Sequence, residues 1–298
     1  MFTLSFEGQP AQKNPLLRVC ATVAWLDSTG YKPDPAMPLL SAILITCNEE
    51  RDLPQALASL GGLADEIVVV DSGSTDHTCE LARQGGARVV FQPFSGFAEQ
   101  KNFAAAQASH AWVLSLDADE ALSPELRSSL LAWKASRPDC VAYQVGRRTN
   151  YLGKWIRYSG WYPEYHLRLY RRDRARFAGA LHETVRADGP TGRLAGDLLH
   201  YTVRSLAEHY AKLEVFTTLA AEDLYARGRC RWRAAMCLAA PWTFVNTLLF
   251  RLGFLDGYRG ALIAWTSARY VWMKYRKLGQ LVRGGKLERR PWPQAGDA

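Results

Sequence analysis

Four short apolar runs, each followed by polar residues, do most to constrain what this chain can fold into. They span Leu39–Thr46, Glu66–Val70, Arg88–Phe91 and Trp112–Leu116. Helical patterns separate them at about 52–60, 76–84 and 97–108, and the second of these ends at a Gly-Gly pair, a helix-end signal. Strands that alternate with helices at this spacing predict an α/β fold with a mostly parallel sheet and helices on both faces.

Polar side chains cluster where the predicted strands end. They are Asn48, Glu49, Asp71, Ser72, Asp117 and Asp119. Because ligands of such sheets bind outside the carboxyl ends of the strands, we expect these side chains to border a ligand site.

Asp117 and Asp119 follow the fourth apolar run and are one residue apart. Alternate residues of a strand share a face, so both carboxylates would point the same way. Two close carboxylates repel unless a positive group lies between them, and a divalent cation carrying phosphate oxygens suits that position. Asp-x-Asp is also common in loops, so the pair alone does not decide the matter.

Two further segments suggest nucleotide binding. Asp71–Asp76 reads either as a plain turn with Asp76 as a helix N-cap or as a strand tip whose Asp71 accepts hydrogen bonds from a uracil or ribose. Lys101 and Asn102 lie either on a solvated helix face or against the nucleotide, where Lys101 would counter phosphate charge. No Gly-x-Gly-x-x-Gly motif is present, which argues against a dinucleotide fold.

After Cys140 the sequence becomes basic and rich in strand patterns, at 141–147 and 166–170. The second strand begins a run of arginines that would be a solvated face or an anion-binding cluster: Arg168, Arg171, Arg172, Arg174 and Arg176. Glu183 follows as a possible general base. His200 reads as a core or edge histidine or as a further metal ligand.

The C-terminal third carries the whole positive excess of the chain. From Ser205 to Ala298 there are 15 Lys and Arg against 7 Asp and Glu, whereas the formal net charge of the complete chain is +8. Ser205 fits a capping box that starts a helix of about five turns. Residues 234–250 lack charge but contain Pro241, and we favour an interfacial, re-entrant or protein-packed segment over a membrane span. Basic residues interleaved with Trp and Tyr suit an anionic membrane surface or a nucleic acid.

The six cysteines form no Cys-x-x-Cys pair and predict reduced, mostly buried thiols in a cytosolic compartment. No signal peptide is expected at the N-terminus, and residues 1–38 read as a poorly ordered extension that ends in a linker.

Taken together, the motifs resemble family 2 glycosyltransferases of the GT-A fold. The resemblance is carried by Thr46-Cys47-Asn48-Glu49, Asp71–Asp76, Gln100-Lys101-Asn102 and Leu116–Glu120. Later elements are similar to lipopolysaccharide-core β-1,4-glucosyltransferases acting on inner-core heptose. These elements are Phe94–Phe97, Trp161–Glu164, the arginine-rich strand, His182-Glu183 and Leu255-Asp256-Gly257.

The resemblance implies an inverting, metal-dependent transfer of a hexose, with UDP-glucose as the expected donor and a lipid-linked saccharide as acceptor. It implies a catalytic domain over 39–204 and a helical, membrane-associating region over 205–298. The enzyme would be cytoplasmic and peripheral on the inner face of the plasma (inner) membrane, with no nucleic acid as partner. The implied metal is Mg²⁺ or Mn²⁺, held by Asp119 with Asp117 and His200. The implied base is Glu183, with Glu164 in reserve. The implied nucleotide-sugar contacts are Thr46, Asn48, Glu49, Asp71, Ser72, Lys101, Asn102 and Asp117, and the implied acceptor or phosphate contacts are Arg168, Arg171 and His182.

Three alternatives stay open at this point. Another cell-surface polysaccharide or lipid-linked acceptor would fit the same motifs. A sugar-nucleotide nucleotidyltransferase typically begins with a Gly-rich loop, which Thr46–Leu53 lacks. A membrane- or nucleic-acid-binding protein on a degenerate scaffold would be expected to lose Asp117 or Asp119, and both are present.

Overall fold

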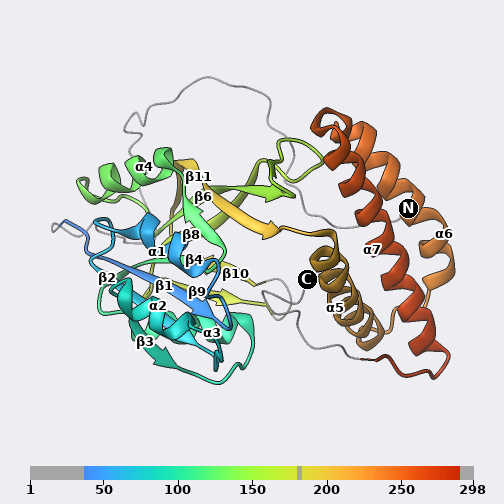
Figure 1. The fold of residues 1–298 in the computed structure, drawn as a ribbon, viewed down its shortest axis with the longest axis horizontal. Coiled ribbons are helices and arrows are strands. Elements are labelled where there is room, and N and C mark those ends of the chain that lie inside the picture. The colour runs from blue at the N-terminus through green and yellow to red at the C-terminus, as the bar shows by residue number, and fades with distance from the viewer. Residues whose placement is uncertain (1–36, 180–182, 289–298) are drawn as a thin grey trace. The chain divides into compact units, whose positions relative to one another are not determined.

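The computed structural model describes residues 37–179 and 183–288 (Figure 1). Residues 1–36 of the predicted extension over 1–38 lie outside these ranges. His182 also lies outside them.

The core of the described chain is a nine-stranded sheet in the order β3-β2-β1-β4-β8-β6-β11-β5, with β7 paired to β6. Its strands are β1 (Leu40–Thr46), β2 (Glu66–Asp71), β3 (Arg88–Phe91), β4 (Trp112–Asp117), β5 (Glu120–Leu122), β6 (Ala142–Tyr151), β7 (Lys154–Trp155), β8 (Glu164–Arg171) and β11 (Thr191–Val203). A separate antiparallel ribbon consists of β9 (Ala175–Ala178) and β10 (Thr184–Ala187).

The prediction of a mostly parallel sheet is correct only for the first half of the chain. Strands β3, β2, β1 and β4 are parallel, as predicted. Beyond β4 the sheet is mixed, because β8 runs antiparallel to both β4 and β6, β11 is parallel to β6, and β5 is antiparallel to β11. No helix lies between β6 and β8, and strands joined without a helical crossover pair antiparallel.

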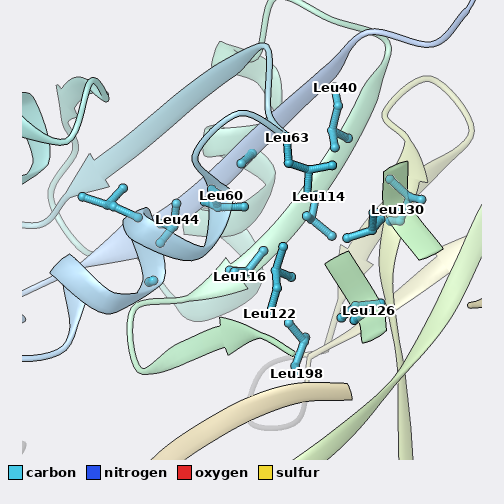
Figure 2. Packing of buried hydrophobic residues seen from close by; sticks show 14 of the residues in the cluster. Leu40, Leu44, Leu60, Leu63, Leu114, Leu116, Leu122, Leu126, Leu130 and Leu198 are labelled. Carbon is cyan, nitrogen blue, oxygen red and sulfur yellow. The ribbon is translucent and has the colours of Figure 1, made fainter. Parts of the chain in front are cut away.

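Helices cover both faces of the sheet, as expected. They are α1 (Leu53–Leu60), α2 (Thr78–Gln84), α3 (Phe97–Gln107) and α4 (Pro124–Lys134). Alternate residues of β1 enter different cores, since Leu44 packs in a cluster with α1 and α4 whereas Ile43 packs in a cluster with α3. Figure 2 shows Leu44, Leu60 and Leu130 among the side chains of the first cluster.

Two predicted helix starts are confirmed. The Ser123 hydroxyl accepts a hydrogen bond from the backbone N–H of Leu126, with Pro124 at the first helical position. The Ser205 hydroxyl accepts one from Glu208 at the start of α5 (Leu206–Ala226), and Glu208 accepts one from the backbone N–H of Arg204. Both arrangements satisfy backbone donors that a helix leaves unpaired at its first turn.

The rest of the C-terminal region consists of α6 (Trp232–Val245), a π-helical turn η1 (Asn246–Phe250), a 3-10 turn η2 (Gly253–Asp256) and α7 (Tyr258–Val282). Helices α6 and α7 lie side by side (Figure 1), and Trp232 packs against Gly279. The charge-free stretch 234–250 is thus divided between α6 and η1, and no helix within 37–179 and 183–288 is long and apolar enough to cross a membrane.

The prediction of mostly buried thiols is wrong for the described cysteines. Cys47, Cys230 and Cys237 are exposed, and Cys79 and Cys140 are partly exposed. All five are free, as expected for reduced thiols.

Glu66 at the start of β2 ties together the amino-terminal ends of the parallel strands. Its carboxylate accepts hydrogen bonds from Ser41 Oγ (2.6 Å), from Ser109 N (2.7 Å) and Oγ (2.9 Å), and from Arg88 (2.9 Å). Burial acts to raise the pKa of Glu66, but these donors outweigh it and lower the pKa from 4.5 to about 2.

We therefore expect Glu66→Gln to destabilise the fold by the order of 2 kcal/mol at neutral pH. A lowered carboxyl pKa stabilises the fold above the unfolded value, and this contribution is lost as the pH falls from about 4.5 to about 2. The difference in unfolding free energy between wild type and variant, measured by urea denaturation, should shrink over that range. Glu80→Gln, on the exposed face of α2, is the matched control and should change stability little at any pH; a Glu66→Gln deficit that is independent of pH would contradict the prediction.

Candidate active site

The loops that follow β1 and β2 are bonded into one wall at the carboxyl edge of the sheet. Asp71 accepts hydrogen bonds from Thr46 Oγ1 (3.1 Å), from the backbone N–H groups of Gly73 and Ser74 (both 2.8 Å), and from the Ser74 hydroxyl. Burial acts to raise the pKa of Asp71, but the bonds from Ser74, Gly73 and Thr46 lower it overall. Asp71 therefore stays ionised and holds its own loop in shape.

Asn48 joins the same wall from the other side. Its backbone has a positive φ of 56°, a conformation that asparagine tolerates better than most residues. Its N–H donates to Ser74 Oγ (2.8 Å), and its side-chain oxygen accepts from the backbone N–H of Thr75 (2.8 Å). Ser72 accepts a hydrogen bond from the Gln100 side chain (3.0 Å), which links the wall to α3.

Lys101 on α3 lies at the centre of a buried ion-pair network. Its Nζ is 2.7 Å from Asp117 Oδ1 at the end of β4 and 2.9 Å from Glu183 Oε1, and its side chain is only 5% exposed. Burial acts to lower the pKa of Lys101, but the charges of Asp117 and Glu183 outweigh it and raise the pKa. The predicted base and the predicted nucleotide-binding aspartate thus share one cation.

Arg168 on β8 completes the network from beneath. Its guanidinium donates to Asp117 Oδ2 and to Glu120 Oε1, both at 2.8 Å, and its side chain is 5% exposed. Burial acts to raise the pKa of Asp117, but the charges of Arg168 and Lys101 hold it well below its usual range. Both carboxylate oxygens of Asp117 are therefore bonded to protein cations, and Arg168 lies beneath the site rather than on its surface.

Glu120 and Arg147 are site residues that the sequence reasoning missed. Glu120 is buried, accepts a hydrogen bond from the Asp117 backbone N–H (3.1 Å), and has its Oε1 3.9 Å from Arg147. Arg147 in turn is 2.7 Å from Glu164, whose other oxygen is 3.2 Å from His166. Glu120 belongs to the acidic run after β4, so its position in that run could have indicated a role in the site. Nothing in the sequence around Arg147 indicated such a role, because its partners are distant in sequence.

Asp119 and His200 form a second pair beside this network. His200 lies on β11 opposite Glu120, and its Nε2 is 3.2 Å from Asp119 Oδ2. Burial opposes ionisation of both groups, but their mutual attraction lowers the pKa of Asp119 and raises that of His200. Burial, and after it the charge of Asp119, raises the pKa of Glu49 to about 7.

A carboxylate and an imidazole at this separation suit a divalent cation, since both are common metal ligands. Within the described ranges, no group of three or more His, Cys, Asp or Glu side chains is arranged to hold a metal by itself. Of the described residues, Asp119 and His200 are the pair that could contribute to such a site.

The structure does not bring every predicted residue to this site. Asn102 makes two 2.9 Å hydrogen bonds with the backbone of Phe177 and so joins α3 to β9. Arg171 pairs with Trp112 in the sheet, at the opposite end of β4 from Asp117, and its side chain bonds Asp173. The arginine run after Arg168 is therefore not one anion-binding cluster.

Comparison with known proteins identifies the family. The family model for glycosyl transferase family 2 matches residues 41–188. The chain is 34% identical over 260 residues to the lipopolysaccharide core biosynthesis glycosyltransferase LpsC of Rhizobium meliloti, covering 83% of this chain and 93% of that protein. It is 29% identical over 259 residues to an uncharacterized glycosyltransferase of Rickettsia typhi, covering 82% of this chain and 88% of that protein. The chain belongs to glycosyltransferase family 2 and is a glycosyltransferase related to one of lipopolysaccharide core biosynthesis.

Among solved structures, glucosyl-3-phosphoglycerate synthase from Mycobacterium tuberculosis, in complex with Mn²⁺, UDP and glucosyl-3-phosphoglycerate, matches with 29% identity and a TM-score of 0.31. The match covers 39% of this chain and 45% of that one.

Arg168→Met should destabilise the fold by about 3–5 kcal/mol, because it leaves Asp117 and Glu120 buried without their shared cation. Arg171→Met is the matched control from the same strand, since its exposed pair with Asp173 contributes at most about 1 kcal/mol. Unfolding free energies from urea denaturation would test the contrast, and equal losses in the two variants would contradict it.

Proposed function

We propose that this glycosyltransferase moves a hexose, with inversion, from a nucleotide-sugar donor to a hydroxyl of a lipid-linked saccharide. UDP-glucose is the proposed donor, and an inner-core heptose of lipopolysaccharide is the proposed acceptor. The observation that carries the proposal is the convergence of Asp117 and Glu183 on Lys101, beside the Asp119–His200 pair. The relation to a lipopolysaccharide core biosynthesis glycosyltransferase supports the acceptor class. Another cell-surface polysaccharide or lipid-linked acceptor is the second candidate.

The donor's nucleotide would lie against the wall formed by the loops after β1 and β2. Thr46, Asn48, Glu49, Asp71 and Ser72 border this wall. Thr46, Asn48 and Asp71 would act mainly by holding the loop backbone, since their polar atoms bond within the wall. Asp117, at the end of β4, stays the candidate for the ribose.

Asp119 and His200 are the residues that would hold Mg²⁺ or Mn²⁺. When bound there, the cation would neutralise the charge that develops on the departing diphosphate. His200 must be neutral to act as a ligand, so binding would release the proton that its contact with Asp119 now favours. Lys101 adds a further positive charge at the same edge of the sheet.

Glu183 is the proposed general base, which takes the proton from the acceptor hydroxyl. A base with a very low pKa accepts a proton poorly at neutral pH. Burial acts to raise the pKa of Glu164, but His166 and Arg147 lower it to about 2, which argues against Glu164 in this role. Glu183 pairs with Lys101 and is placed beside Asp117 through it.

We propose the domain division 39–204 and 205–298, with the second part associated with the inner face of the cytoplasmic membrane. The positive excess of the second part supports this, because basic residues near an anionic surface contribute about 1 kcal/mol each.

Glu183→Gln should lower the rate of glucose transfer by roughly 10²–10⁴-fold, since the acceptor hydroxyl loses its base while the shape of the side chain is kept. Glu164→Gln is the matched control and should lower the rate much less. Transfer from UDP-glucose to a lipopolysaccharide-core acceptor under single-turnover conditions would measure both. A wild-type rate in Glu183→Gln together with a large loss in Glu164→Gln would move the base assignment to Glu164.

Asp119→Asn should lower transfer by at least about a hundredfold and raise the Mn²⁺ concentration needed for half-maximal rate. Asp173→Asn, whose carboxylate bonds Arg171 at the far end of β8, should behave like the wild type. Donor hydrolysis measured across a Mn²⁺ titration, with and without chelator, gives the readout. Turnover that a chelator leaves undiminished would exclude the metal site.

A further inference from the structure

The turn between α6 and α7 exposes an unusual amount of apolar surface. Leu249, Phe250, Leu252, Phe254, Leu255 and Tyr258 are each between 43% and 68% exposed. Leu238, Trp242, Val245 and Leu249 are also exposed and are spaced by four, three and four residues, so they share one helical face that runs into the turn. We call the exposed side chains of residues 238–258 the apolar turn surface. Contiguous exposed apolar surface of this kind marks an interaction site.

The charge around this surface indicates which partner fits it. From Leu224 to Leu287 the sequence contains twelve Lys and Arg residues but a single acidic residue, Asp256. Asp256 is only 3% exposed, whereas Arg251 in the turn is exposed, as are Arg231 and Arg233 at the amino-terminal end of α6. An apolar face that includes Trp242 and Tyr258 and has the exposed Arg251 within it suits an anionic lipid surface, into which the apolar side chains insert while the basic residues of the same region meet headgroups. A second copy of this chain would instead bring two equally cationic surfaces together.

Asp256 ties the apolar turn surface to the catalytic domain. Its carboxylate accepts hydrogen bonds from the backbone N–H groups of Arg157 (3.1 Å) and Tyr158 (3.0 Å) and from Ser159 Oγ (3.0 Å). Lys154 Nζ donates to the Asp256 carbonyl (2.9 Å), and the Ser159 N–H donates to the Arg251 carbonyl (2.9 Å). The loop 154–160 is therefore held by the turn.

That loop leads directly into the site. Residues 161–163 connect it to Glu164, the first residue of β8, which pairs with Arg147 beside Glu120. Any surface that fixes the turn also fixes the entry to β8.

We propose that the apolar turn surface docks on an anionic lipid bilayer and that Asp256 transmits this placement to the loop that enters β8. The docking would bring the site to an acceptor anchored in the same bilayer, and in this respect the inference rests on the proposed function. Two exposed aromatic side chains of this surface are Phe250 and Phe254, 67% and 52% exposed.

The test measures binding of the full chain to vesicles of phosphatidylcholine alone and of phosphatidylcholine with phosphatidylglycerol. Wild type should bind the anionic vesicles more tightly, and added salt should weaken binding. Phe250→Ser with Phe254→Ser should weaken binding by at least about tenfold, because two aromatic side chains no longer enter the bilayer. The matched control is Leu39→Ser with Leu131→Ser, which removes two exposed leucines outside the C-terminal region and should bind as wild type does.

Hydrogen exchange on adding anionic vesicles tests the transmission through Asp256. Exchange should slow in 246–258 and also in 154–160, where Arg157 and Tyr158 donate to Asp256. If hydrogen exchange slows in 246–258 but not in 154–160, the transmission through Asp256 is wrong. If the Phe250/Phe254 variant binds vesicles as wild type does, the apolar turn surface is not the docking surface. A wild-type dimer that the same variant dissociates, with vesicle binding unaffected, would assign the surface to a second copy.

UDP-glucose hydrolysis without vesicles separates this inference from the proposed function. Both double variants should retain wild-type hydrolysis, because none of their residues lies in the site. If wild type does not hydrolyse UDP-glucose, the proposed donor is wrong. If the Phe250/Phe254 variant loses vesicle binding but hydrolyses UDP-glucose normally, the docking surface is supported and the proposed donor is unaffected.

Discussion

The site depends on the neutralisation of buried carboxylates by Lys101 and Arg168. Asp117 and Glu120 lie three residues apart, Glu183 comes from a distant segment, and their side chains are 28%, 0% and 19% exposed. Without a cation between them they would repel one another, and each would pay a desolvation cost. Lys101 on α3 pairs with Asp117 and Glu183, and Arg168 on β8 pairs with Asp117 and Glu120. The pairs therefore also fix how a helix, three strands and the segment at residue 183 meet. Because these cations balance Asp117, the neighbouring Asp119 is left to pair with His200.

Features encoded by neighbouring residues could be predicted from the sequence. The four parallel strands, the helices between them and the caps at Ser123 and Ser205 follow from short-range patterns, and the structure has them at nearly the expected bounds. The insertion of β8 between β4 and β6 could not be predicted, because strand order depends on contacts between residues far apart in sequence. The sequence left His200 open between a core or edge histidine and a metal ligand, and its position beside Asp119 depends on the pairing of β11 with β5.

The arginine run illustrates why a linear cluster of charge is a poor guide to a site. Alternation along β8 turns Arg168 inward, while Arg171 lies at the other end of the strand and pairs with Asp173. Arg172 donates to carbonyl groups at the C-terminal end of α3, where a cation also opposes the helix dipole. Asn102 likewise serves the fold by binding the backbone of Phe177. In each case the residue type was compatible with ligand binding. For Arg168, Arg172 and Asn102 the partner that decided the role was distant in sequence, whereas Arg171 bonds Asp173 two residues further on.

The departure from a parallel sheet is what allows the second half of the chain to contribute to the site. Since β8 runs antiparallel to β4, the first residues of β8 lie at the same edge as the last residues of β4. Glu164 and His166 therefore approach the carboxyl end of the parallel strands, which a parallel β8 would have placed at the opposite edge. The segment before β8 is the one that Asp256 binds. The antiparallel insertion thus supplies residues to the site and connects the site, through loop 154–160, to the C-terminal helices.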